Sequence, residues 1–221
     1  MAKILIVSAH ADDEIFGMGG TLLKLSKNED NDISWLILSK IWEPKWSAKE
    51  ISGRDIAIKK LNELIGFKSV HHWDYKDNKL DTYSTNELQD KLILLIDQIK
   101  PEIIYTPSVW DFNHDHRIAC ELIEMSTKSY YSRSIKEIIA YEIPSSTDHS
   151  FSSIKRFTPN LYHDITSTID DKLKALEIFD SELKLFPHPR SKEYVKSLAM
   201  VRGGESGVKF AEAFHILKSL R

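Results

Sequence analysis

Short runs of consecutive large aliphatic residues alternate in this chain with longer stretches whose apolar residues recur at helical spacing. The first run, residues 4–9, begins Ile-Leu-Ile-Val and has no polar face, which is typical of a strand buried on both sides of a sheet. The other predicted strands are 33–39, 70–75, 102–106 and 138–143, and the predicted helices are 17–27, 47–64, 85–100, 115–130, 169–185 and 191–201. This alternation predicts an α/β fold with a mostly parallel sheet and helices on both faces.

The length of 221 residues suits one sizeable core, and we expect residues 1–221 to form a single domain. The 30 basic and 33 acidic residues give a net charge of −3, so bulk charge indicates neither a nucleic-acid nor a membrane partner. No stretch approaches the roughly 18 apolar residues of a membrane span, and the N-terminal run is too short for a signal peptide. We therefore expect a cytoplasmic protein.

The single cysteine, Cys120, excludes an internal disulfide and a cysteine-rich zinc finger. A transition-metal site in this chain must therefore use carboxylates and some of the nine histidines.

One histidine and three acids lie within five residues directly after the first predicted strand, in the segment His-Ala-Asp-Asp-Glu at 10–14. Carboxylates this close raise one another's pKa, and a divalent cation removes the repulsion. His10 and Asp13 offer a nitrogen and an oxygen, which suit zinc. On this segment alone a second interpretation is equally good: Asp13 caps the following helix and His10 is an ordinary loop residue.

A second polar segment, Trp-Asp-Phe-Asn-His-Asp-His-Arg at 110–117, follows the fourth predicted strand and opens a helix. Ligands of parallel sheets bind beyond the carboxyl ends of the strands, and strands one and four often flank the point where the strand order reverses. A histidine of this segment could then join His10 and Asp13 on one ion. Three protein ligands with one open position are typical of catalytic zinc.

Three sequence motifs occur in an order that points to a known family. They are His-Ala-Asp-Asp-Glu with Gly-Gly-Thr at 10–21, Asn-His-Asp-His-Arg at 113–117, and Arg-Gly…Gly…Ala-Glu-Ala-Phe at 202–214. They resemble, in order, the His-Pro-Asp-Asp-Glu…Gly-Gly-Thr signature, the Asp-His-Arg motif and the C-terminal motif of the LmbE/PIG-L family of zinc-dependent N-deacetylases. The resemblance spans nearly the whole chain and implies a Rossmann-like fold.

The resemblance also implies roles for individual residues. The metal ligands would be His10, Asp13 and His116, with Zn²⁺ as the cofactor and Fe²⁺ or another divalent ion as an alternative. Asp12 falls on the family's general base. Arg54 and Asp77 fall on positions that contact substrate in the family.

Two residues depart from the family pattern. Ala11 replaces the usual proline, and Asn113 stands where many members carry a histidine that stabilises the oxyanion or acts as an acid. An amide can donate a hydrogen bond to an oxyanion but cannot transfer a proton. The acid that protonates the leaving amine is therefore left open between Asp12, acting as both base and acid, and His114.

The resemblance further implies hydrolysis of the N-acetyl group of an amino sugar or its conjugate, by a protein that could form a homo-oligomer. Two other segments could reach such a site. Trp42 and Trp46 lie in a loop after a predicted strand, where they either stack on a sugar or simply pack a lid. The turn 187–191, Pro-His-Pro-Arg-Ser, either places His188 in the pocket or only connects two helices, with Ser191 as the cap.

Three other protein classes share part of this pattern. A nucleotide-binding protein would need a third glycine at position 22, which is leucine. A magnesium-binding receiver domain would not need histidines, because magnesium prefers oxygen ligands. The remaining alternative is a catalytically impaired carbohydrate-binding relative, which Asn113 leaves open.

Overall fold

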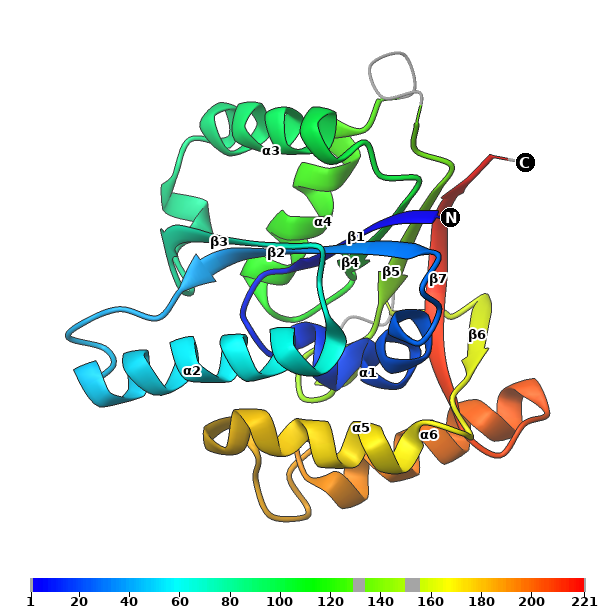
Figure 1. The fold of residues 1–221 in the computed structure, drawn as a ribbon. Helices are drawn as coiled ribbons and strands as arrows, with labels where there is room; N and C mark the ends of the chain where they lie inside the picture. The colour runs from blue at the N-terminus through cyan, green and yellow to red at the C-terminus, as the bar shows by residue number, and fades with distance from the viewer. Residues whose placement is uncertain (1, 129–133, 150–155, 221) are drawn as a thin grey trace.

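The computed structural model describes residues 2–128, 134–149 and 156–220, and a seven-stranded sheet forms its centre (Figure 1). The strand order is β3-β2-β1-β4-β5-β7-β6, and the first five strands in the chain run parallel. The strands are β1 (Ala2–Ser8), β2 (Asn31–Lys40), β3 (Ser69–Lys76), β4 (Ile103–Pro107), β5 (Glu137–Tyr141), β6 (Leu161–Asp164) and β7 (Ala211–Ser219). The predicted α/β class and mostly parallel sheet are confirmed.

Helices cover both faces of the sheet, as Figure 1 shows with α3 and α4 on one side and the other four on the opposite side. The helices are α1 (Asp13–Ser26), α2 (Ala48–Ile65), α3 (Thr85–Ile99), α4 (His114–Ser126), α5 (Ile169–Ala175) and α6 (Lys192–Ser206). Three 3₁₀ segments, η1 (Leu80–Thr82), η2 (Thr147–His149) and η3 (Leu176–Glu182), complete the described elements. The predicted end of the fourth helix, Tyr130, lies outside the described residues.

The two faces of the sheet carry separate hydrophobic cores because successive side chains of a strand point to opposite faces. Ile4 and Ile6 of β1 pack into the core under α1 and α2, whereas Leu5 and Val7 pack under α3 and α4. All four side chains are almost completely buried. This burial on both faces explains why the first strand reads as an unbroken aliphatic run.

The C-terminal third differs from its prediction in two ways. Strands β6 and β7, which the sequence analysis missed, join the sheet in antiparallel pairing, with β7 against β5. The predicted helix 169–185 ends as an α-helix at Ala175 and continues as η3, with non-helical backbone at Phe179. The ring of Phe179 is buried in the core, so tertiary packing overrides the helical periodicity here.

Helix α1 has non-helical backbone at Met18, and the C-terminal motif binds the backbone N–H groups that follow this break. The backbone N–H groups of Gly20 and Thr21 donate to the carboxylate of Glu212 at 2.8 and 2.7 Å. The ammonium of Lys172 donates to the same carboxylate at 2.6 Å and to the Phe16 carbonyl at 2.8 Å. The motif around residue 212 therefore supports the helix that begins at Asp13.

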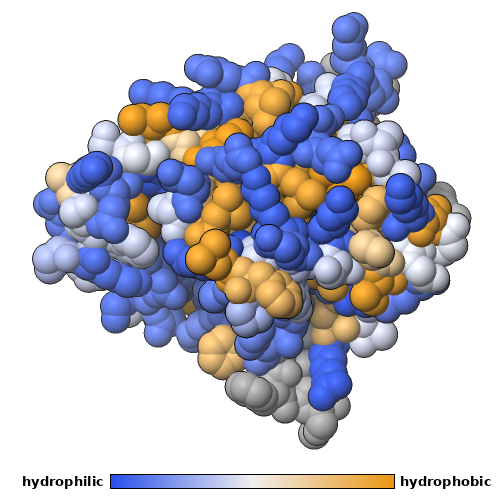
Figure 2. Space-filling model, turned by 90° about the horizontal axis from the view of Figure 1, so that it is seen from below, coloured by the Kyte–Doolittle hydropathy of each residue, from blue (hydrophilic) through white to orange (hydrophobic). Residues whose placement is uncertain are grey.

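The surface seen from the side of α5 and α6 is mainly hydrophilic, with several hydrophobic patches between the polar side chains (Figure 2). Among the described residues, none of the helices combines the length and the apolar character needed to cross a membrane.

Candidate metal centre and active-site pocket

The two polar segments singled out in the sequence meet at the carboxyl ends of β1 and β4, which are neighbours in the sheet. Residues 9–12 follow β1 directly and lead into α1, while residues 108–113 follow β4 and lead into α4. The β3 strand end contributes a third segment, residues 77–79, before η1. The site therefore lies at the edge where ligands of parallel sheets bind.

Three potential metal-ligating atoms converge at this edge. His116 Nε2 lies 3.2 Å from His10 Nδ1 and 3.2 Å from Asp13 Oδ1, and His10 Nδ1 lies 3.6 Å from Asp13 Oδ2. Asp13 and His116 are completely buried, and Asp13 Oδ1 has no hydrogen-bond partner among the described residues. A buried carboxylate oxygen that accepts no hydrogen bond and lies beside the His116 imidazole, with His10 Nδ1 beside the second oxygen, fits a divalent cation that takes nitrogen and oxygen ligands.

The orientation of His116 is fixed by an acid that the sequence analysis did not assign. His116 Nδ1 lies 3.1 Å from Asp111 Oδ2, which also accepts hydrogen bonds from the hydroxyls of Ser146 at 3.0 Å and Thr147 at 2.6 Å. A proton on Nδ1 leaves Nε2 free to bind a cation. A metal-ligating histidine needs such an acceptor, and this requirement was the signal that could have singled out Asp111.

His10 is oriented in the same way by two carboxylates. Its Nε2 lies 3.1 Å from Asp77 Oδ1 and 3.2 Å from Asp115 Oδ2, so Nδ1 is the atom that faces Asp13 and His116. Burial alone would raise the pKa of Asp77, but its hydrogen bond to His10 holds that pKa below the usual range. Asp77 was expected to contact substrate. In the structure its carboxylate binds His10 and accepts a hydrogen bond of 2.9 Å from Lys45.

The Asp12 carboxylate contacts two guanidinium groups. Arg190 Nη1 donates to Asp12 Oδ2 at 3.0 Å, and Arg54 Nη1 lies 3.9 Å from Asp12 Oδ1. Glu182 accepts from both arginines, and Arg54 also donates to the Ala11 carbonyl at 2.8 Å. Burial raises the pKa of Asp12, and the charges of Arg190 and Arg54 offset part of that rise.

Asn113 caps helix α4 and lines the pocket at the same time. Its side-chain oxygen accepts the Asp115 backbone N–H at 2.9 Å, which leaves the amide NH₂ as the available polar group. The residue can therefore donate a hydrogen bond to a ligand without giving up its structural role.

His10 and Asp12 line a pocket of about 130 Å³, whereas the buried Asp13 and His116 are not in its lining. The pocket brings together most of the predicted site residues and adds Glu182 and Arg190; its lining also includes His10, Asp12, Arg54, Asp77 and Asn113. His188 is not in this lining: it is exposed, and its Nδ1 accepts the Arg190 backbone N–H at 3.0 Å. Ser191 does cap α6, so the turn 187–191 both connects two elements and delivers Arg190 to Asp12.

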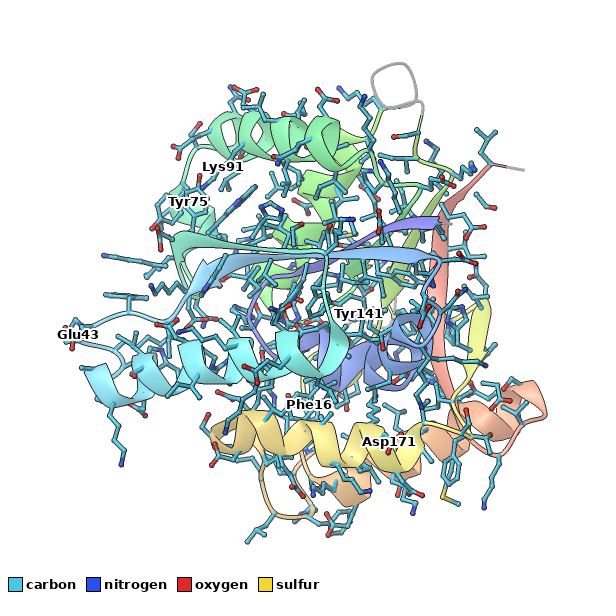
Figure 3. The ribbon with its side chains drawn as sticks, in the orientation of Figure 1. Phe16, Glu43, Tyr75, Lys91, Tyr141 and Asp171 are labelled. Atoms are coloured by element: carbon cyan, nitrogen blue, oxygen red, sulfur yellow. The ribbon has the colours of Figure 1, made fainter. Side chains whose placement is uncertain are left out.

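The loop between β2 and α2 forms one side of the pocket, and Glu43 marks its projecting tip in Figure 3. Trp46 lines the pocket, whereas Trp42 donates from Nε1 to the Asp77 carbonyl at 3.3 Å. Through its carbonyl and its carboxylate, Asp77 thus joins this loop to His10.

Comparison with known proteins identifies relatives along the whole chain. Residues 5–126 match the family model described as PIG-L, GlcNAc-PI de-N-acetylase. The diacetylchitobiose deacetylase of Thermococcus kodakarensis is 25% identical over 234 residues, an alignment that covers 99% of this chain and 84% of the relative.

Solved structures share the fold at lower identity. The N,N′-diacetylchitobiose deacetylase of Pyrococcus horikoshii matches with a TM-score of 0.78 and 23% identity, over 98% of this chain and 84% of that chain. The 4-carboxy-2-hydroxymuconate hydratase of Pseudomonas putida matches with a TM-score of 0.76 and 21% identity, over 98% of this chain and 96% of that chain. At this identity the fold is shared by enzymes of different chemistry, so the site must decide the function.

Proposed function

The chain belongs to the PIG-L family of GlcNAc-PI de-N-acetylases, and on that premise we propose that it is a metal-dependent hydrolase that removes the N-acetyl group from an amino sugar. The observation that carries the proposal is the convergence of Asp13, His10 and His116, because His10 also lines the pocket that contains Asp12. The names of the relatives support an N-acetylated sugar as the substrate.

The three converging residues would hold the metal, and the donor set of two imidazoles and one carboxylate suits zinc, with Fe²⁺ as an alternative. When bound, such an ion supplies Lewis acidity toward the amide carbonyl and lowers the pKa of water. Asp111 orients His116, while Asp77 and Asp115 orient His10. These contacts keep both histidines in the tautomer that a metal site needs.

Asp12 is the proposed general base. It lies next to the metal ligand Asp13 in sequence but faces the pocket, where it would accept the proton of the attacking water and pass it to the leaving amine. Arg190 keeps the carboxylate ionised and fixes its position. The amide NH₂ of Asn113 would donate to the carbonyl oxygen as negative charge develops there.

Acetate release tests the proposal. We expect protein purified without chelator to hold close to one zinc or iron ion per chain and to release acetate from N-acetylated sugars. Asp12→Asn should retain the metal and lose activity by a factor of about 10²–10⁴. Asp74→Asn, a matched change at a side chain that is 91% exposed on β3, should leave the activity unchanged.

Three results would contradict parts of the proposal. Wild-type activity in Asp12→Asn would exclude Asp12 as the base. Full activity without metal would exclude the metal mechanism. Binding of N-acetylated sugars without acetate release would favour the impaired carbohydrate-binding alternative, which Asn113 supports because its amide cannot transfer a proton.

A further inference from the structure

Glu182 lines the active-site pocket but has no part in the proposed reaction. It is the last residue of η3, and its carboxylate bridges the two guanidinium groups of the pocket lining. Oε2 accepts a hydrogen bond of 2.7 Å from Arg190 Nη1, and Oε1 accepts one from Arg54 Nη2. One carboxylate of the protein therefore occupies two cations that could otherwise bind a ligand.

The two arginines would by themselves make the pocket attractive to anions. Guanidinium groups are the usual partners of phosphate and carboxylate groups, because their N–H donors match pairs of oxygen atoms. Two positive charges at a pocket of about 130 Å³ would raise the local concentration of anionic ligands.

Two carboxylates cancel the charge of the arginines. Arg190 donates to both Asp12 and Glu182, and Arg54 Nη1 lies 3.9 Å from Asp12 Oδ1 while Nη2 contacts Glu182. The cluster thus holds two cations and two anions. Without the charge of Glu182, the two arginines would face only the charge of Asp12, and the cluster would become positive.

The position of Glu182 is fixed by its surroundings, so the carboxylate does not give way easily to an incoming anion. The ring of Phe179, three residues earlier in η3, is 1% exposed, and the Arg54 guanidinium lies over it at 5.6 Å. The chain after η3 returns to Arg190 through a hydrogen bond of 3.3 Å from the Lys184 N–H to the Arg190 carbonyl. The Glu182 side chain itself is only 16% exposed.

An anionic group that entered the pocket would lie near the Glu182 carboxylate while its natural partners, Arg54 and Arg190, are already engaged. Like charges brought together in a partly buried site repel strongly, and such repulsion against the wrong ligand is a common source of specificity. An uncharged sugar meets no such repulsion, because its hydroxyl groups can donate hydrogen bonds to a carboxylate.

We propose that Glu182 is a specificity-determining residue that excludes N-acetylated sugars carrying a phosphate or carboxylate group. The exclusion acts through charge, so removal of that charge should admit anionic substrates. This inference rests on the proposed deacetylase function.

A change of substrate preference tests the proposal. Acetate release is measured on N-acetylglucosamine, its 1-phosphate and its 6-phosphate at about pH 8, where both phosphates are doubly charged. We expect Glu182→Gln to raise the phosphate-to-sugar ratio of kcat/KM about tenfold for at least one phosphate. The ratio cancels any loss that acts through Asp12, because all three sugars use the same base.

Three further variants separate charge from structure. Glu177→Gln is the matched control on η3, at a side chain that is 61% exposed, and should keep the wild-type ratio. Glu182→Asp keeps the charge and should also keep the ratio. Glu182→Ala removes the charge without placing an amide donor against the arginines, so it should raise the ratio even if Glu182→Gln does not fold. The increase should shrink in about 0.5 M salt, which a purely structural effect would not do.

An unchanged ratio for both phosphates in Glu182→Gln and Glu182→Ala would overturn the proposal, as would a wild-type preference for either phosphate over the uncharged sugar. Absence of acetate release from all three sugars by the metal-loaded protein would instead overturn the proposed function. Calorimetric binding of the two phosphates then decides the role of Glu182. Tighter binding to Glu182→Gln than to the wild type and to Glu177→Gln supports it, and equal or absent binding refutes it.

Discussion

Arg190 and Asp12 lie 178 positions apart in the chain, yet the Arg190 guanidinium donates a 3.0 Å hydrogen bond to the Asp12 carboxylate. Arg190 is itself fixed by Glu182 at 2.7 Å and by Ser145 at 3.0 Å, and it packs over the ring of Phe16. Phe16 belongs to α1, which packs against α5. A cation held this firmly beside a buried carboxylate keeps that carboxylate ionised in surroundings that oppose its charge.

Loss of the Arg190 charge should therefore shift the pH dependence of the reaction. Burial already raises the pKa of Asp12, and Arg190→Gln removes the main offset, so the pKa should rise further. Because the base must be ionised, we expect the acid limb of kcat/KM to move to higher pH. The measurement is a pH–rate profile, with Lys184→Gln, an exposed cation on the same connection, as the control. An unmoved acid limb in Arg190→Gln would refute this role.

Substitutions at Asn113 can separate its role as the cap of α4 from its proposed role as a hydrogen-bond donor to the substrate. Asp and Ser cap helices as well as Asn does, so Asn113→Asp and Asn113→Ser should keep the thermal stability of the protein. Asp supplies no N–H donor at neutral pH, and we expect kcat to fall by a factor of about 10²–10³ in Asn113→Asp if the amide stabilises the oxyanion. Equal loss of stability and activity in both variants would assign Asn113 a purely structural role.

The sequence predicted the parallel part of the sheet well because β1, β2 and β4 are buried on both faces and read as aliphatic runs. It missed β7, whose first residues, Ala-Glu-Ala-Phe, were assigned to a motif and not to a strand. β7 pairs with both β5 and β6, and the β5 residues that it pairs with lie more than 70 positions away; Glu212 is buried by its contacts to Lys172 and α1. Such long-range pairing leaves no local periodicity.

The site residues likewise divide into those that the sequence predicted and those that it missed. The segments after β1 and β4 carry their polar residues next to each other in sequence, so they could be recognised as a pair. Glu182 accepts from Arg54, which lies 128 positions away in the chain, and Asp77 faces His10 only because β3 ends at the same edge of the sheet. Asp111 is close to His116 in sequence, but the hydroxyls that complete its contacts, of Ser146 and Thr147, lie 35 and 36 positions away. The sequence analysis placed Arg190 in the turn 187–191 but gave it no role, because its partner Asp12 lies 178 positions away.

Metal binding should strengthen as the pH rises. Burial opposes the charged form of His116, but Asp13 and Asp111 outweigh it and raise its pKa to about 9; Asp13 likewise raises the pKa of His10. Both rings must lose a proton before they bind metal. We expect a lower dissociation constant for Zn²⁺ at about pH 9 than at about pH 6, measured by competition with a chromogenic chelator.

The thermal stability of the metal-free protein should instead fall as the pH rises. A histidine whose folded pKa exceeds its unfolded value of about 6.5 stabilises the fold fully below that pH and loses this contribution as the pH rises toward about 9. Thermal unfolding of chelator-treated protein should therefore show a falling midpoint over this range, while the metal-loaded protein keeps or raises its midpoint. Parallel curves for the two forms would exclude protonated histidines at the site.

The buried pair of Lys172 and Glu212 should be the most sensitive ionic contact for folding. Both side chains are 4% exposed, and Glu212 also accepts the N–H groups of Gly20 and Thr21 at the break in α1. Glu212→Gln leaves the Lys172 ammonium buried without a countercharge, and we expect it to lower the free energy of unfolding by about 3–5 kcal/mol.

Urea denaturation measures the loss, and two further variants show its cause. Glu102→Gln, which breaks the exposed pair with Lys136, should change stability little. Lys172→Met added to Glu212→Gln should recover part of the loss, because the unpaired cation is removed. If the double variant is no more stable than Glu212→Gln, the cost lies instead in the N–H groups of α1, and the carboxylate acts chiefly as the cap of the broken helix.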